Sequence, residues 1–187
     1  MSFPGIPSLD AAVMAFIQTH FHNTVTDTVF PIITSLGEAG IGWIVLSLVL
    51  LCFKKTRRTG GLVLIAMTVT LLFGELTLKN IICRLRPCNV FTDFPMLIAR
   101  PTSYSFPSGH TSSSFAAALI LTLRHKKVGW LAYIPAVLIA FSRIFLFVHY
   151  PTDVLAGILL GTLAALLTYF AAKAIQKRQA GKRTAQI

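Results

Sequence analysis

Long apolar stretches alternate with short polar ones along most of this chain. Apolar side chains dominate five stretches, at about residues 37–53, 60–79, 109–123, 128–148 and 152–172. A helix needs roughly 20 apolar residues to cross the ~30 Å hydrocarbon core of a bilayer. The pattern therefore predicts an all-α integral membrane bundle with about five spanning helices.

The N-terminal segment has a different pattern. Leu9, Val13, Phe16 and Ile17 recur at helical spacing, but polar residues at 18–20 and 22–23 interrupt any spanning run. We expect residues 9–30 to form an amphipathic helix in the membrane interface, within an interfacial segment covering residues 1–36.

Composition agrees with a membrane protein. The 187 residues are 55% hydrophobic and 12% charged, which is too apolar for a soluble domain of this size. The chain contains no linker-like stretch and no internal repeat, so residues 1–187 are expected to form a single membrane-embedded domain.

A net charge of +11 raises the question of nucleic acid binding, which the positions of the charges answer. Twelve of the 17 basic residues follow the first, third and fifth stretches, as Lys54, Lys55, Arg57 and Arg58; Arg124, Lys126 and Lys127; and Lys173, Lys177, Arg178, Lys182 and Arg183. One orientation places all three clusters, including a basic tail at 174–187, in the cytoplasm of a cell membrane. The charge thus reflects topology, and no nucleic acid partner is expected.

Three motifs fall at the opposite, extracytoplasmic ends of the stretches. They are Lys79 with Arg86-Pro87; Pro107-Ser108-Gly109-His110; and Ser142-Arg143 with His149 and Asp153. Together they supply three permanent cations, two imidazoles and a carboxylate. Such a set is suited to holding a phosphate and attacking its phosphorus.

In the first motif, Lys79 and Arg86 are seven residues apart, which on a helix returns to nearly the same face. They could bind phosphate oxygens, or they could extend to lipid headgroups. Glu75 lies one turn before Lys79, and the i to i+4 spacing predicts a supporting ion pair.

The second motif precedes a long apolar run. A helix beginning at Gly109 would direct free N–H groups outward, where they bind anions, although Ser108 could be only a helix cap. His110 could donate a proton to a leaving oxygen.

In the third motif, Arg143 lies within an apolar stretch, where an unpaired guanidinium is costly and indicates a nearby anion. Asp153 follows His149 by four residues. It could accept a hydrogen bond from one ring nitrogen and leave the other as a nucleophile.

The three motifs together resemble the signature of the type 2 phosphatidic acid phosphatases. That signature reads Lys, six residues, Arg-Pro; Pro-Ser-Gly-His; and Ser-Arg, five residues, His, three residues, Asp. Every position matches between residues 79 and 153. Many family members have six spans, whereas this sequence predicts five and an interfacial helix.

The resemblance implies a phosphatase that needs no metal or other cofactor. His149 corresponds to a nucleophile that forms a phosphohistidine, Asp153 to the residue orienting it, and His110 to the acid protonating the leaving group. The phosphate-binding positions correspond to Lys79, Arg86, Ser108, Gly109 and Arg143.

A site at the bilayer boundary favours a lipid phosphate over a soluble one, and by analogy we favour undecaprenyl diphosphate. Phosphatidic acid and phosphatidylglycerol phosphate remain competitors, as does transfer of the phosphoryl group to an acceptor other than water. A non-enzymatic alternative is an anion or lipid transporter. It is less favoured because the charges gather at one face. Oligomeric state is not predicted.

Two features near the motifs have open roles. The loop at 88–106 is rich in apolar residues, which predicts that it rests on the bilayer or covers a lipid tail and selects substrate. Cys83 and Cys88 could form a disulfide there, but free thiols are expected because the end of a helix need not bring them together.

Overall fold

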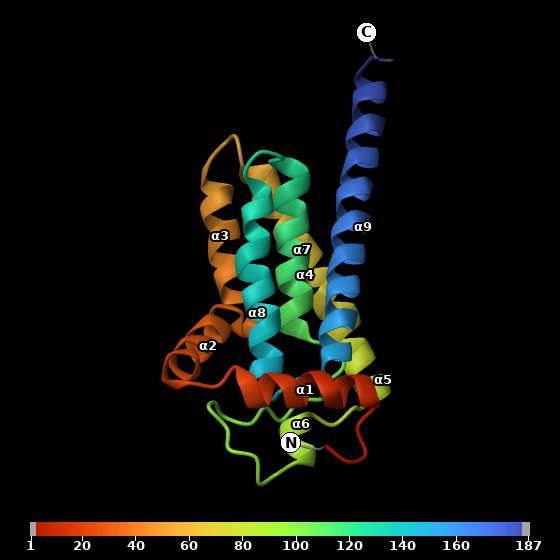
Figure 1. Ribbon diagram of the computed structural model, residues 1–187. Helices are drawn as coiled ribbons and strands as arrows, with labels where there is room; N and C mark the ends of the chain where they lie inside the picture. Colours follow the sequence, from red (N-terminus) through yellow and green to blue (C-terminus); the bar gives the residue numbers. More distant parts are fainter. Residues whose placement is uncertain (1–2, 185–187) are drawn as a thin grey trace.

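The computed structural model describes residues 3–184, and every regular element within that range is helical (Figure 1). A bundle of long helices runs along one axis. A long loop covers one of its ends, and the N-terminal helices flank that end. The elements are α1 (Ser8–His20), α2 (Thr24–Leu36), η1 (Glu38–Gly40), α3 (Ile41–Cys52), α4 (Arg57–Thr70), the π-helix η2 (Leu71–Leu78), α5 (Lys79–Ile82), α6 (Pro87–Val90), α7 (Gly109–Arg124), η3 (Gly129–Ala132), α8 (Tyr133–Phe145) and α9 (Pro151–Thr184).

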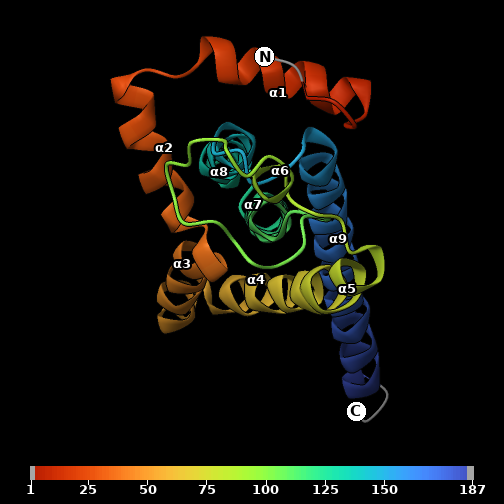
Figure 2. The ribbon, with the colours of Figure 1, turned by 90° about the horizontal axis from the view of Figure 1, so that it is seen from below.

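Helix α7 lies at the centre of the bundle and packs against α4, α8 and α9 (Figure 2). Its inward positions are small: Ala116, Ala117 and Ala118 are fully buried, as is Ser114. Small side chains allow neighbouring helices to approach closely on several sides. A helix surrounded by protein in this way does not need a lipid-compatible surface.

The predicted apolar stretches are helical, but not every one of these helices is long and apolar enough to cross a membrane. Two helical stretches are long and apolar enough to cross a membrane: Arg57–Val90, which is interrupted at residues 83–86, and Pro151–Lys182. A third candidate is the pair α2 and η1–α3, which is bent by 45°. The expected count of five is therefore only partly supported. The central α7 has 16 residues, many of them small or polar, and the apolar helix Gly129–Phe145 is also short.

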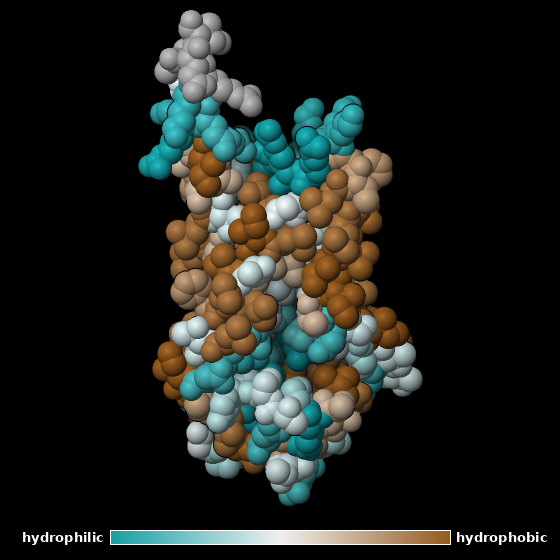
Figure 3. All heavy atoms as spheres, turned by 180° about the vertical axis from the view of Figure 1, so that it is seen from behind, coloured by the Kyte–Doolittle hydropathy of each residue, from teal (hydrophilic) through white to brown (hydrophobic). Residues whose placement is uncertain are grey.

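The basic clusters gather at one end of the bundle. The α3–α4 loop, the α7–η3 loop and the C-terminal end of α9 lie together at the top of Figure 1. Figure 3 shows a hydrophilic end there and a hydrophobic band across the middle of the molecule. Helix α9 continues to Thr184, so most of the basic tail is helical, while residues 185–187 lie outside the described range.

The N-terminal segment forms two helices, so the single helix expected over residues 9–30 is wrong. Asn23 ends the run because its side chain accepts hydrogen bonds from the N–H groups of Val25 and Thr26 and caps a new helix. Helix α1 then lies crosswise beside one end of the bundle, next to α8 and α9, whereas α2 leads obliquely into α3 (Figures 1 and 2).

The loop at 88–106 crosses the same end of the bundle (Figure 2). Phe94 stacks on the buried Phe147 with ring centroids 3.9 Å apart, and Phe91 packs on Phe3. Much of its apolar surface therefore contacts the protein itself, while Leu97 and Tyr104 remain exposed. Both cysteines near the loop are free thiols, Cys83 exposed and Cys88 buried.

Candidate active site

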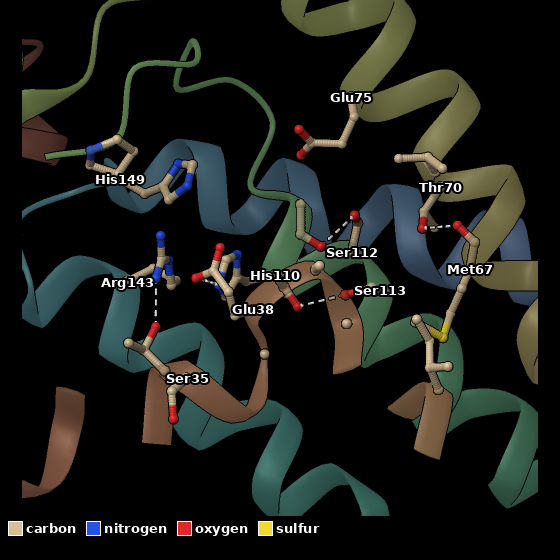
Figure 4. A pocket seen from close by; sticks show the side chains of 18 of the residues that line it. Ser35, Glu38, Met67, Thr70, Glu75, His110, Ser112, Ser113, Arg143 and His149 are labelled. Carbon is tan, nitrogen blue, oxygen red and sulfur yellow. Dashed lines mark hydrogen bonds and ion pairs between the residues drawn. The ribbon is translucent and has the colours of Figure 1, made fainter. Parts of the chain in front are cut away.

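Residues from all three motifs meet at one cavity, of about 880 Å³, near the end of the bundle that carries α1. Its polar wall includes His149, Arg143 and His110 (Figure 4). Lys79, Arg86, Gly109 and Glu75 also line it. The remaining wall is largely apolar and comes from α2, α3, α4 and the loop near residue 98. The convergence expected from the sequence is therefore present.

Lys79 is buried, and its Nζ lies 2.8 Å from Oε2 of Glu75, so the expected ion pair forms. Glu75 lies in the π-helix η2, a geometry that often marks functional sites. A Cβ added to Gly109 would collide with Oε1 of Glu75. Only glycine thus allows the start of α7 to approach this carboxylate.

Arg86 lies at the cavity, but not on the helical face that its spacing from Lys79 predicts. The helix ends at Ile82, and Cys83 takes a left-handed conformation with φ of 51°. Arg86 is therefore extended and does not share a helical face with Lys79. Its guanidinium donates to the carbonyl and hydroxyl of Ser103 at 2.7 and 3.0 Å, and to the carbonyl of Val148 at 2.9 Å.

Arg143 is 3% exposed and donates from Nη1 to the hydroxyl of Thr34 at 2.5 Å. Its Nε is buried without a hydrogen-bond partner. A buried guanidinium with an unsatisfied donor is costly unless an anion completes its bonding. Because Arg143 lies on the cavity wall, an anion in the cavity could complete that bonding.

The two nitrogens of His149 have different partners. Nη1 of Arg86 lies 2.8 Å from Nε2, and a guanidinium can only donate, so Nε2 must accept and the ring proton belongs on Nδ1. Burial, and then the charges of Arg86, Arg143 and Lys79, hold the pKa of His149 well below its ordinary value. The imidazole is thus neutral, with a lone pair on Nε2.

Asp153 lies behind the Nδ1 side of this ring, but the expected direct hydrogen bond is long. Nδ1 of His149 is 3.5 Å from Oδ2 of Asp153 and 3.4 Å from the hydroxyl of Ser105. That hydroxyl donates to the same carboxylate oxygen at 2.5 Å, and the Tyr150 N–H donates to it at 2.9 Å. The Ser105 hydroxyl therefore contacts both groups and connects the imidazole to the carboxylate.

The segment before His149 turns tightly. Phe147 is left-handed with φ of 58°, an uncommon conformation for a residue with a side chain. The N–H groups of Val148 and His149 both donate to the carbonyl of Arg143, at 3.2 and 3.1 Å. The turn fixes the imidazole relative to the guanidinium.

The first turn of α7 faces the same cavity through Gly109 and His110. Ser108 occupies the N-cap position, but its side chain does not cap the helix and instead accepts from the hydroxyl of Thr111 at 2.9 Å. Its N–H donates to the carbonyl of Asp153 at 3.1 Å, which joins the starts of α7 and α9. Ser108 is buried behind the wall of the cavity.

His110 lies opposite an acidic residue that the sequence did not single out. Its Nε2 is 3.4 Å from Oε2 of Glu38, and both side chains line the cavity (Figure 4). Glu38 belongs to η1, where α2 turns into α3. Nothing in the local sequence pairs it with His110, because they are 72 residues apart.

Four further residues of the site were also not identified from the sequence. They are Asp10, Thr34, Arg84 and Ser105, which contact Asp153, its neighbour Thr152 or Arg143. Asp10 and Arg84 were seen only as charges in the overall count. Asp10 lies in the first turn of α1, where acidic residues are common, so its residue type alone does not indicate a functional role.

Comparison with known proteins places this arrangement in a family. Residues 59–177 match the family model of the PAP2 superfamily. The chain is 39% identical over 127 residues to an undecaprenyl-diphosphatase of Sulfolobus acidocaldarius, covering 67% of this chain and 61% of that protein. It is 31% identical over 157 residues to the undecaprenyl-diphosphatase BcrC of Bacillus subtilis, covering 79% and 76%.

The fold is also shared with a solved structure. The PAP2-type phosphatidylglycerolphosphate phosphatase of Bacillus subtilis superposes with a TM-score of 0.73 at 29% identity, over 92% of this chain and 89% of that one. The family match covers most of the chain and includes all three motifs. This chain belongs to the PAP2 superfamily.

Proposed function

We propose that this protein is a membrane lipid phosphatase in which His149 attacks phosphorus. One observation carries the proposal: three buried cations, two histidines and two carboxylates line a single cavity whose remaining wall is mostly apolar. A phosphate fits the charged end, and a lipid chain fits the apolar remainder.

The cations and a helix start form the phosphate site. Lys79, Arg86 and Arg143 neutralise charge on the phosphoryl oxygens, and free N–H groups at the start of α7 add hydrogen bonds. Gly109 leaves room for the oxygens, and Ser108 holds the turn. Phosphoryl transfer depends mostly on such positioning and charge stabilisation.

The reaction then proceeds in two steps. The Nε2 lone pair of His149 attacks phosphorus as Arg86 shifts its hydrogen bond to a phosphate oxygen; the bond to the lipid oxygen breaks, and His110 gives that oxygen a proton. Water next attacks phosphorus and gives a proton to His110, the bond between phosphorus and Nε2 of His149 breaks, and inorganic phosphate leaves. Asp153 supports the imidazole through its Nδ1 side. The negative charge of the phosphate favours protonated His110, and Glu38 is placed to hold its ring.

The favoured substrate is undecaprenyl diphosphate, cleaved to the lipid monophosphate and inorganic phosphate. Two relatives are named undecaprenyl-diphosphatases, although the match covers only 61% of the Sulfolobus protein. Phosphatidylglycerol phosphate is the main competitor, because it is the substrate named for the similar solved structure. Phosphatidic acid is a third candidate.

The proposed topology has five spans, with α1 in the external interface and the basic loops in the cytoplasm. Helices α7 and α8 complete the count as short spans, α7 shielded from lipid by its neighbours. The whole chain then forms one membrane domain, and the cavity opens near the extracytoplasmic surface. The basic end of the bundle supports this orientation through the positive-inside rule.

The test is phosphate release by purified protein in detergent, with EDTA present, from a panel of lipid mono- and diphosphates. We expect turnover without added metal, ranked highest for polyprenyl diphosphate. His149→Ala should abolish it and prevent acid-labile phosphoenzyme from forming, while His125→Ala, at the opposite end of α7, serves as the matched control. Full turnover by His149→Ala would remove the proposed nucleophile.

Phosphoryl transfer to a lipid or sugar acceptor is the second candidate, because it shares the first step. Products formed with and without acceptors separate the two: a phosphorylated acceptor with little free phosphate indicates transfer. A transporter would instead move lipid phosphate across vesicles without cleaving it.

A further inference from the structure

Asp10 in α1 is fully buried at the junction with α9. Its Oδ1 accepts from the backbone N–H of Thr152 at 2.9 Å. Its Oδ2 accepts from the Thr152 hydroxyl and from Nη2 of Arg84, both at 2.7 Å. An interfacial helix is thus bonded to the first turn of the helix that carries Asp153.

Arg84 connects this carboxylate to a second one. Its Nη1 donates to Oδ1 of Asp153 at 2.6 Å, and the guanidinium lies over the ring of Tyr150 at 3.8 Å. One planar cation is therefore clamped between two buried carboxylates and an aromatic face. Such a fork fixes the orientation of both partners, which a lysine could not do.

The two oxygens of Asp153 are used on different sides. Oδ1 contacts Arg84, while Oδ2 faces Ser105, the Tyr150 N–H and the His149 ring. Asp10 and Arg84 stand behind the cavity wall, so neither is placed to touch substrate. Their side chains reach the reaction centre through Asp153 and its neighbours Tyr150 and Thr152.

We infer that Asp10 and Arg84 are positioning residues, through which α1 fixes the Asp153 carboxylate in the rotation that supports His149. This inference rests on the proposed function, in which His149 is the nucleophile. Loss of Asp10 leaves Arg84 with a single anchor. Loss of Arg84 leaves two buried carboxylates with no cation between them, so Asp153 turns away from the imidazole.

The experiment compares Asp10→Asn, Arg84→Lys and Arg84→Ala with the control Asp27→Asn, which removes a carboxylate of α2 outside this network. We expect kcat, and the rate of phosphoenzyme formation in a single turnover, to fall by roughly 10- to 100-fold, with KM changed less than about threefold. Asp27→Asn should match the parent protein. Guanidinium ion at millimolar concentration should restore part of the Arg84→Ala activity, because the site is partly open to solvent, and tetramethylammonium should not.

Three outcomes separate the possibilities. A lower melting temperature with unchanged kcat in Asp10→Asn and Arg84→Lys overturns the inference and leaves α1 docking as purely structural. Loss of activity without any guanidinium rescue, together with a shifted elution volume, has the same meaning. Undiminished turnover by His149→Ala in the same series refutes the proposed function itself.

Discussion

At the residue scale, Arg143 favours ligand binding at the expense of the stability of the fold. The side chain is almost fully buried, has one hydrogen bond to Thr34, and shares its cavity with two other cations. Without an anion it contributes desolvation cost and like-charge repulsion. Glu38 and Glu75 in the same cavity supply part of the compensating charge, and a bound anion would add to it.

Arg143→Met tests this directly. Methionine has similar volume and no charge, so the melting temperature of the substrate-free protein should be equal or higher. The ratio kcat/KM for a lipid phosphate should fall by at least about 100-fold. Arg124→Met, at the other end of the bundle, is the matched control and should keep full activity. A large drop in melting temperature for Arg143→Met would show that the cation serves the fold.

The Glu75 side chain lies so close to Gly109 that it favours glycine at this position. In Gly109→Ala the new methyl group must displace the end of the Glu75 side chain, which is flexible, so the fold should tolerate the change. Moving that carboxylate breaks its ion pair with Lys79 and fills space beside the helix start. We expect a melting temperature within about 3 °C of the parent and activity reduced by roughly tenfold or more. Gly61→Ala, where no atom lies within 4 Å of the added Cβ, is the control.

At the element scale, the close approach of α7 and α9 holds two motifs together. Gly157 and Gly161 are one helical turn apart on α9 and face α7: a Cβ at Gly157 would lie 2.7 Å from the Ser108 carbonyl, and one at Gly161 would overlap the Ser112 carbonyl. Small residues at this spacing allow helix backbones to touch. The start of α7 is thereby held beside Asp153.

Gly161→Ala should therefore separate these two helices. Because the obstacle is backbone, no side chain can move aside, and we expect a lower melting temperature together with lost activity. Gly181→Ala, in the same helix with no atom within 4 Å, should raise or preserve stability. Thermal unfolding in detergent of the two variants makes the comparison. Equal melting temperatures would mean that the contact is looser than described.

At the scale of the whole molecule, two ends of opposite character support the proposed orientation in the membrane. The described basic loops occupy one end, and the cavity, α1 and the long loop occupy the other. Two exposed thiols mark these ends, Cys52 beside the first basic cluster and Cys83 beside the motifs.

Labelling of intact cells with a membrane-impermeant maleimide tests which end of the bundle faces outward. With Cys88 buried, Cys52→Ser leaves Cys83 as the exposed thiol and should be labelled. Cys83→Ser leaves Cys52 and should be labelled only after the membrane is permeabilised. The reverse pattern would place the cavity in the cytoplasm.

Much of the fold and of the candidate site could be predicted from the sequence, because the patterns involved are local. Apolar periodicity predicted the helical class, charge clusters predicted a common end for three loops, and the motif spacings identified several of the residues that line the cavity. The ion pair of Glu75 with Lys79 followed from one turn of helix. These features depend on neighbours a few residues apart, which the chain order itself specifies.

Tertiary structure alone decided how those parts meet. The break at Asn23 separates α2 from α1, which lies crosswise beside the end of the bundle. The turn at Cys83 redirects Arg86, and the Ser105 hydroxyl contacts both His149 and Asp153. Asp10 and Arg84 acquired partners 142 and 69 residues away in sequence. Contacts of this kind arise from helix packing and loop closure over long separations. No local pattern encodes them, since each depends on where the rest of the chain lies.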